Sequence, residues 1–376
     1  MMRRIWALCL CAALLLSGCG WFDGSYVNVT PYQQHGASAQ TEAVSANNYT
    51  QLRDALEALV SMGTESSVIY VADYNPDLIE ENLRHATLYI LEVFPLGAYA
   101  VEDISYEVGT SSGKPAIAVN IEYRRSKSEI RRIRTVKDIE KASEVIGEAL
   151  RDVDSVMVLA IEEYRNTDFV QLVESYVERH PEYVMESPMV AVGIFGNGLE
   201  RIVELNFTYQ NSRDSLKQMK IQVQPMFDAA ALYVTGAGED RQKFAQLYSF
   251  LMERFDYKLE TSLTPAYSLL CHGVGDSRAF AQVYASMCRR AGLECRIVTG
   301  TRNGEPWTWN LVNANGSYYH VDLLRCSVQG GFRETVDAEM SSYVWDYSAY
   351  PATAVPVTPT EPAAGSQETD STEKTS

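Results

Sequence analysis

The chain has 376 residues and a hydrophobic fraction of 46%, which is enough to fill the cores of about two or three domains. Its formal net charge of −17 opposes contact with phosphate backbones, so nucleic acid is excluded as an expected partner. No Cys-x-x-Cys or paired-histidine spacing is present, and the sequence predicts neither a metal site nor a cofactor.

Residues 1–18 have the order of an export signal. Arg3 and Arg4 precede an apolar run that ends at Leu16, which is shorter than the ~20 residues needed to span a bilayer. The run closes on Leu16-Ser17-Gly18-Cys19, which resembles the bacterial lipobox. The resemblance implies that Cys19 becomes the first residue of a lipoprotein and carries an acyl lipid such as palmitate. The alternative is an ordinary cleavage site that happens to hold a cysteine.

The lipobox resemblance also implies a location on the extracytoplasmic face of the cell membrane, with the membrane as a partner through the lipid on Cys19. Residues 19–48 are rich in Ser, Ala, Asn, Gln and Thr, and we expect them to form a flexible tether. Residues 351–376 form an acidic tail of Pro, Thr, Ser and Ala, which is typical of disorder.

Residues 49–150 are predicted to form a first α+β repeat of the order β-α-β-β-α. Its expected elements are a strand at 67–71, a helix opened by Asn75-Pro76-Asp77, strands at 104–108 and 116–123, and a helix near 135–150. The apolar stripe of the first helix is Leu78, Ile79, Leu83, Ala86 and Ile90.

Residues 151–237 repeat this order. The expected elements are a strand at 155–160, a helix opened by Asn166-Thr167-Asp168, and strands at 189–195 and 202–209. The strands that end at Tyr123 and Tyr209 match best, and a polar stretch and a helix follow each. We interpret the two segments as a duplication. The alternative is a coincidence between two amphipathic α+β segments.

The pattern changes in residues 238–350. Phe244, Leu247, Leu251 and Phe255 indicate one helix, and a second helix is expected to begin near Ser277 and to end at Gly292. Three strands are expected at 295–299, 308–312 and 318–323, with Asn315-Gly316 as the turn between the last two. The predicted fold class is therefore α+β.

This C-terminal region resembles the papain-like core of bacterial transglutaminase-like domains. Those domains typically read Ala-Val-Cys at the start of a core helix, followed by Ile-Val-Thr-Gly, His-Ala-Trp-Asn and Gly-x-Trp-Tyr-His-Val-Asp. Here the corresponding stretches are Arg290-Ala-Gly-Leu-Glu-Cys-Arg-Ile-Val-Thr-Gly300, Trp309-Asn310 and Gly316-Ser-Tyr-Tyr-His-Val-Asp322. The resemblance implies a helix packed on an antiparallel sheet.

The family's chemistry requires a cysteine thiolate, a histidine base and an aspartate that orients the imidazole. In this alignment the three positions hold Ser277, Trp307 and Asp322. A serine hydroxyl needs a base to attack, and an indole nitrogen only donates. The two substitutions therefore predict a transglutaminase-like pseudoenzyme rather than an enzyme.

Other residues near this motif are alternative nucleophiles or bases. Cys271 and His272 could form a displaced Cys–His pair, and His320 shares a strand face with Asp322. The cysteines at 271, 288, 295 and 326 could form two disulfides in three possible pairings, or remain buried thiols.

Three interpretations of function follow. In the first, Trp309, Tyr318, His320 and His272 help to form a binding cleft for a cell-wall peptide, a glycan or an envelope protein. In the second, the domain is an active acyltransferase or peptidase that uses Ser277 or Cys271. In the third, the lipoprotein is structural and the duplicated N-terminal region carries its role.

Overall fold

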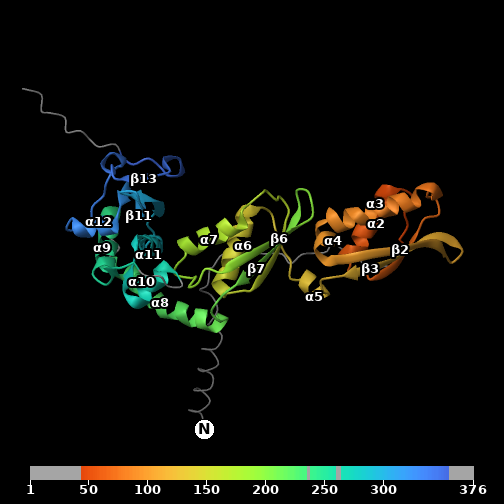
Figure 1. Ribbon diagram of the computed structural model, residues 1–376, viewed down its shortest axis with the longest axis horizontal. Coiled ribbons are helices and arrows are strands. Elements are labelled where there is room, and N and C mark those ends of the chain that lie inside the picture. The colour runs from red at the N-terminus through yellow and green to blue at the C-terminus, as the bar shows by residue number, and fades with distance from the viewer. Residues whose placement is uncertain (1–43, 235–237, 260–263, 355–376) are drawn as a thin grey trace, which may run out of the picture. The chain divides into compact units, whose positions relative to one another are not determined.

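A computed structural model describes residues 44–234, 238–259 and 264–354 (Figure 1). The chain divides into two compact units: the first holds residues up to 142 together with 157–167 and 193–205, and the second holds the remainder. The predicted signal, Cys19 and most of the predicted tether and tail lie outside the described residues. No helix in the described ranges is long and apolar enough to cross a membrane.

The first unit begins with two helices and a three-stranded antiparallel sheet. Its elements are α2 (Tyr49–Ser61), β1 (Ser66–Tyr70), η1 (Pro76–Leu78), α3 (Ile79–Glu92), α4 (Pro95–Ala100), β2 (Val101–Ser111), β3 (Lys114–Tyr123), α5 (Lys127–Ile130) and β4 (Arg134–Val136). The sheet order is β1-β3-β2. Alternate residues of β3, namely Ile117, Val119 and Ile121, are buried with the apolar faces of α2 and α3 in one core.

Two sequence expectations fail in this unit. Leu78, assigned to the apolar stripe, is 44% exposed because Pro76–Leu78 forms a 3-10 turn ahead of α3. Residues 44–46, assigned to the tether, belong to the fold: Ala46 donates to the Tyr70 carbonyl at 2.9 Å and is fully buried. The first error has a local cause, the 3-10 turn, whereas the second arises because Tyr70, distant in sequence, pairs with this segment.

The second segment contains α6 (Ile139–Asp152), β5 (Val156–Ile161), α7 (Phe169–Arg179), β6 (Met189–Phe195), β7 (Arg201–Thr208) and α8 (Arg213–Tyr233). The sheet order is β4-β5-β7-β6, and residues of its strands are assigned to both units. The order β5-β7-β6 corresponds to β1-β3-β2 in the first segment. The duplication stays a prediction, and this shared order is what it requires.

The C-terminal domain is a helix packed on an antiparallel sheet, which confirms the α+β class. Its elements are α9 (Asp240–Met252), β8 (Asp256–Tyr257), α10 (Pro265–His272), β9 (Val274–Gly275), α11 (Ser277–Arg290), β10 (Cys295–Arg302), β11 (Glu305–Ala314), β12 (Ser317–Val321), α12 (Leu323–Val328), η2 (Asp337–Glu339), β13 (Tyr343–Trp345) and η3 (Tyr347–Ala349). The sheet order is β12-β11-β10-β13. The core helix α11 packs against β10 and β11 and is buried along most of its length.

Short-range sequence signals set the two ends of α11 and the turn between β11 and β12. Asp276 caps α11 by accepting from the Ala279 amide at 2.8 Å, and Gly292 adopts φ +75° just after the helix. Asn315 and Gly316 have φ values of +55° and +85°, as the predicted hairpin turn between β11 and β12 requires.

The predicted last strand ends earlier than expected, and the predicted tail begins later. The strand ends at Val321, because Asp322 caps α12 by accepting from the Leu324 and Arg325 amides, both at 3.1 Å. Residues 351–354 are part of the domain: the Ala354 amide donates to the Tyr318 carbonyl at 3.0 Å.

Gly300 in β10 offers a stability test. A Cβ atom there would overlap the Val344 carbonyl oxygen and lie 3.1 Å from the Trp309 ring. We expect Gly300→Ala to lower the free energy of unfolding by about 1–3 kcal/mol, because β13 must move away. The matched control is Gly109→Ala in β2, where nothing lies within 4 Å of the added atom. Denaturant titrations followed by circular dichroism measure both, and equal stabilities for the two variants would contradict this account of the β10–β13 pairing.

Candidate functional site

Asp322, at the end of β12, is the most heavily hydrogen-bonded side chain of the site. It is 3% exposed, and its Oδ1 atom accepts from the two amides of the α12 cap. Its Oδ2 atom accepts from the Tyr343 hydroxyl at 2.6 Å, the Trp307 indole at 2.9 Å and Arg302 at 3.3 Å. These donors compensate the burial of a charged group.

Trp307 lies on β11, and its indole nitrogen points at Asp322. The Arg302 guanidinium lies over the indole, 5.1 Å from the ring centroid, and the Tyr257 ring lies 6.1 Å away. The indole is half-buried. Because its N–H is already donated to Asp322 and it has no lone pair to accept a proton, Trp307 cannot act as a base.

Ser277 is the first residue of α11 and is 9% exposed. Its hydroxyl oxygen accepts from the Thr308 amide at 3.3 Å, which turns the hydroxyl toward β11. Ser277, Thr308 and Asp322 line one small hollow, which has no room for a water molecule. The structure thus brings the three predicted triad positions together around β11 and leaves no open cleft between Ser277 and Asp322.

The start of α11 admits a second alignment that the sequence analysis missed. The family's Val-Cys pair also matches Val274-Gly275, which immediately precedes the Asp276 cap. In that alignment the nucleophile position holds a glycine, and a Cβ there would lie 2.7 Å from the Ala279 Cβ. In both alignments the helix start carries no thiol.

The alternative pair, Cys271 and His272, lies at the end of α10. Burial raises the pKa of the Cys271 thiol, which disfavours the nucleophilic thiolate. His272 is exposed and lies edge-on to the Tyr267 ring at 6.2 Å. A hydrogen bond with Tyr267 partly opposes the rise in the pKa of the thiol. In the described ranges no hydrogen bond joins Cys271 to His272, so the histidine is not placed to act as its base.

Trp309 and His320 belong to the core, which corrects their assignment to a binding surface. Each is 1% exposed, and the Trp309 indole donates to His320 Nδ1 at 2.9 Å. Because an indole nitrogen only donates, Nδ1 is unprotonated, and His320 Nε2 therefore donates to Asp337 at 2.8 Å. Burial lowers the pKa of His320, although Asp337 partly opposes this. His320 is a neutral packing residue.

Tyr318 is half-buried, and its hydroxyl donates to Glu294 at 2.8 Å. Arg296 lies over its ring, 5.5 Å from the centroid. Both the hydroxyl and the ring of Tyr318 therefore already contact other residues of the domain.

The four cysteines of this domain are free thiols in the structure. Cys288 and Cys326 are buried, and burial raises the pKa of both. Among the described residues, no group of three or more His, Cys, Asp or Glu side chains is placed to hold a metal ion.

Comparison with known proteins identifies this domain. Residues 228–331 match the family model described as the transglutaminase-like superfamily, so the chain contains a transglutaminase-like domain. No curated protein matches the chain.

Solved structures with detectable similarity include a TGase, at 10% identity and a TM-score of 0.26, over 57% of this chain and 63% of that one. A candidate cysteine protease from Cytophaga hutchinsonii matches at 12% identity and a TM-score of 0.25, over 42% of this chain and 70% of that one. The periplasmic domain of TgpA from Pseudomonas aeruginosa matches at 16% identity and a TM-score of 0.21, over 35% and 55% of the two chains.

The buried His320 predicts a pH dependence of stability. Its pKa in the folded protein lies below the ordinary value near 6.5, at which the histidine of the unfolded chain titrates. As pH falls through that value, the unfolded chain binds a proton that the folded chain does not. The free energy of unfolding should therefore decrease until folded His320 is protonated as well.

Denaturant titrations from about pH 8 to about pH 5, followed by tryptophan fluorescence, measure this effect. Trp307, Trp309 and Trp345 all report on this domain. His320→Gln should flatten the decrease, whereas His85→Gln, at an exposed position on α3, should leave it unchanged. Equal slopes for the wild type and His320→Gln would show that His320 is not the group responsible.

Proposed function

We propose that the chain is a lipid-anchored, extracytoplasmic lipoprotein whose transglutaminase-like domain is non-catalytic and binds a cell-wall peptide or an envelope protein. The observation that supports this most directly is the 2.9 Å hydrogen bond from the Trp307 indole to Asp322. In the active members that the domain resembles, an imidazole occupies the position of Trp307 and is oriented by the aspartate.

The indole reproduces half of that arrangement. It presents an N–H to the aspartate, as an imidazole does, but it has no second nitrogen to take a proton from a nucleophile. The Ser277 hydroxyl accepts from the Thr308 amide, and in the described ranges no hydrogen bond joins it to an imidazole or a carboxylate. In a serine-protease triad that works as a unit, loss of the nucleophile or the base lowers turnover by about 10⁶-fold.

The surface near Trp307 supports a binding role. Tyr257 is 47% exposed and lies beside the half-exposed indole, and Arg302 covers the ring. Two partly exposed aromatic rings with a nearby guanidinium provide apolar and cationic contacts for a peptide or an envelope protein. In this proposal the ligand lies over Trp307 and does not enter the closed hollow at Ser277.

The catalytic part of the proposal is tested by restoring the triad. The wild type, Ser277→Cys and Trp307→His should show no amine incorporation and no peptide cleavage. Ser277→Cys should become alkylatable by iodoacetamide, because a helix N-terminus favours a thiolate, but it should not turn over. Only the double variant, Ser277→Cys with Trp307→His, combines a thiol, an imidazole and Asp322, so restored turnover is expected in this variant alone.

Two controls make this test decisive. Gly275→Cys combined with Trp307→His covers the second alignment of the nucleophile position. Wild-type turnover that Ser277→Ala or Cys271→Ala abolishes would overturn the non-catalytic proposal in favour of an enzyme with a displaced nucleophile.

The anchoring part rests on the lipobox-like sequence that ends at Cys19. Replacing Cys19 with Ser removes the sulfur that would carry the lipid. We expect the variant to move from the membrane fraction to the soluble fraction on ultracentrifugation, with Cys271→Ser as the matched control that stays membrane-bound. Membrane retention of Cys19→Ser would show that the chain is held by some other means.

A further inference from the structure

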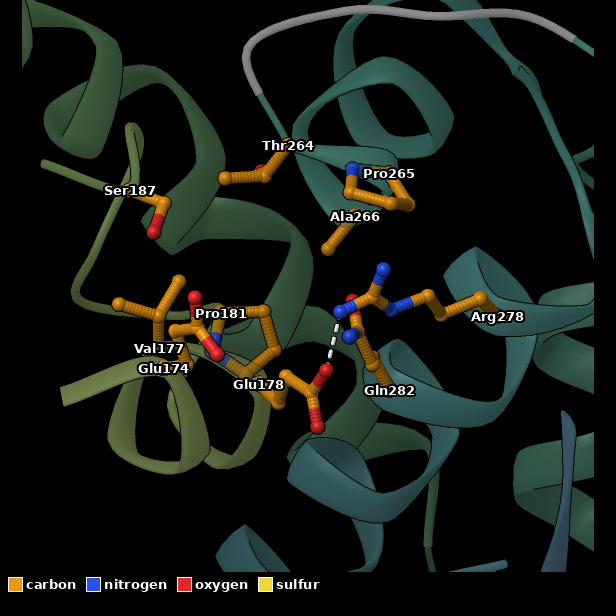
Figure 2. Close-up of a pocket in the computed structure, with 10 residues that line it drawn as sticks. All are labelled: Glu174, Val177, Glu178, Pro181, Ser187, Thr264, Pro265, Ala266, Arg278 and Gln282. Carbon is orange, nitrogen blue, oxygen red and sulfur yellow. Dashed lines mark hydrogen bonds and ion pairs between the residues drawn. The ribbon is translucent and has the colours of Figure 1, made fainter. Parts of the chain in front are cut away.

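A second concave site lies in the same unit as the triad, between α7, α10 and α11 (Figure 2). Its volume is about 440 Å³, which is within the usual range of small-ligand sites. Helix α11 contributes Arg278 and Gln282 to this cleft, whereas Ser277 and Ala281 line the closed triad hollow. The two sites therefore use different faces of one helix.

The side-chain amide of Gln282 forms the polar floor of the cleft. The residue is 4% exposed, and its side-chain amide forms no hydrogen bond with any residue that the structure describes. Its amide atoms are nevertheless not sealed off from the cleft. Because the amide can be reached from the cleft, a ligand that supplies both a donor and an acceptor would pair with it there.

The charges of the cleft favour a cation. Arg278 forms an ion pair with Glu178, drawn as a dashed line in Figure 2, so its guanidinium is already compensated. Glu174 lies one turn earlier on the same face of α7 and has no hydrogen bond or ion pair within the described ranges. The lining therefore carries two carboxylates against one guanidinium, and the carboxylate of Glu174 is available to a ligand.

Apart from the hydroxyl residues Ser187 and Thr264, the rest of the lining is apolar and compact. Val177 and Pro181 come from the α7 side, and Pro265 and Ala266 open α10 on the other side. These short, stiff side chains leave a wall that suits a small aliphatic group and offers no aromatic ring for stacking.

We propose that this cleft binds the amino-terminal end of a short peptide. The α-ammonium group pairs with Glu174, the first peptide amide exchanges hydrogen bonds with Gln282, and a small aliphatic side chain packs against the proline-lined wall. An anionic ligand fits less well, since the one guanidinium is already paired with Glu178. The proposal goes beyond the substituted triad and does not depend on it.

Isothermal titration calorimetry of the full chain in detergent tests the site with alanyl-alaninamide, which combines a free ammonium group, amides and methyl groups. The acetylated form of the same dipeptide amide lacks the charge and should bind at least about tenfold more weakly, as expected for loss of one charge-assisted contact. Glu174→Gln should weaken binding of the free-amine probe by a similar factor and should abolish the difference between the two probes.

Gln282→Leu keeps the side-chain volume and should weaken binding of both probes. Glu253→Gln is the matched control, because it removes one exposed carboxylate from the same unit outside the cleft and should leave binding unchanged. Glu174 is exposed, so Glu174→Gln keeps the test valid even if Gln282→Leu fails to fold. The proposal is overturned if the wild type does not bind the free-amine probe, or if it binds both probes equally. These outcomes leave the turnover assays of the triad variants unaffected.

Discussion

The buried charge of Asp322 is the constraint on which the C-terminal domain depends. A carboxylate that is 3% exposed needs donors, and this one takes them from β10, β11, β13 and the first turn of α12. Burial and the neighbouring Asp322 raise the pKa of Tyr343, so its hydroxyl remains a donor. Removal of one donor leaves part of this buried charge without compensation, so such a substitution costs more than the net contribution of the contact itself. One side chain thus fixes the register of the sheet edge against the helix that follows it.

In the proposed non-catalytic domain, the same constraint lets the site keep its architecture without its chemistry. Asp322 requires an N–H from position 307, and an indole supplies this as well as an imidazole does. Catalysis requires in addition a nitrogen that accepts a proton, and the fold does not enforce that requirement. The indole is also larger than an imidazole, and it lies between the Arg302 guanidinium and the partly exposed ring of Tyr257. In this proposal the reaction is lost while the hydrogen bonds to Asp322 persist.

How much the sequence could predict depended on whether the deciding contact was local. The Asn315-Gly316 turn, the Asp168 cap of α7 and the strand Met189–Phe195 follow from short-range rules, and the structure has them where expected. The α12 cap was missed because Asp322 was assigned to a strand at 318–323. Its carboxylate in fact caps α12 and also accepts hydrogen bonds from the sheet. Core packing is the expected environment for Trp309 at a family-typical position, but its pairing with His320 could not be predicted, because the pair also depends on Asp337 and Trp345, which lie farther along the chain. The nucleophile position at the start of α11 stayed ambiguous, because both Ser277 and Gly275 can be aligned with the family's cysteine.

Helix α11 links these observations, because its two faces have opposite environments. The face of Ser277 and Ala281 packs on β11 so closely that no water enters, and the Asn310 amide donates to the Ala281 carbonyl there at 2.9 Å. The face of Arg278 and Gln282 borders the cleft against α7, where a buried amide is left without a partner in the described part of the chain. The closed face also holds an unpaired amide oxygen, because Asn310 Oδ1 is buried without a partner in the described part of the chain. The α7 side differs in that its cleft is open and in that Glu174 presents an exposed carboxylate to it. A ligand that binds directly against α11 is therefore expected on the α7 side and not in the closed hollow between Ser277 and Asp322.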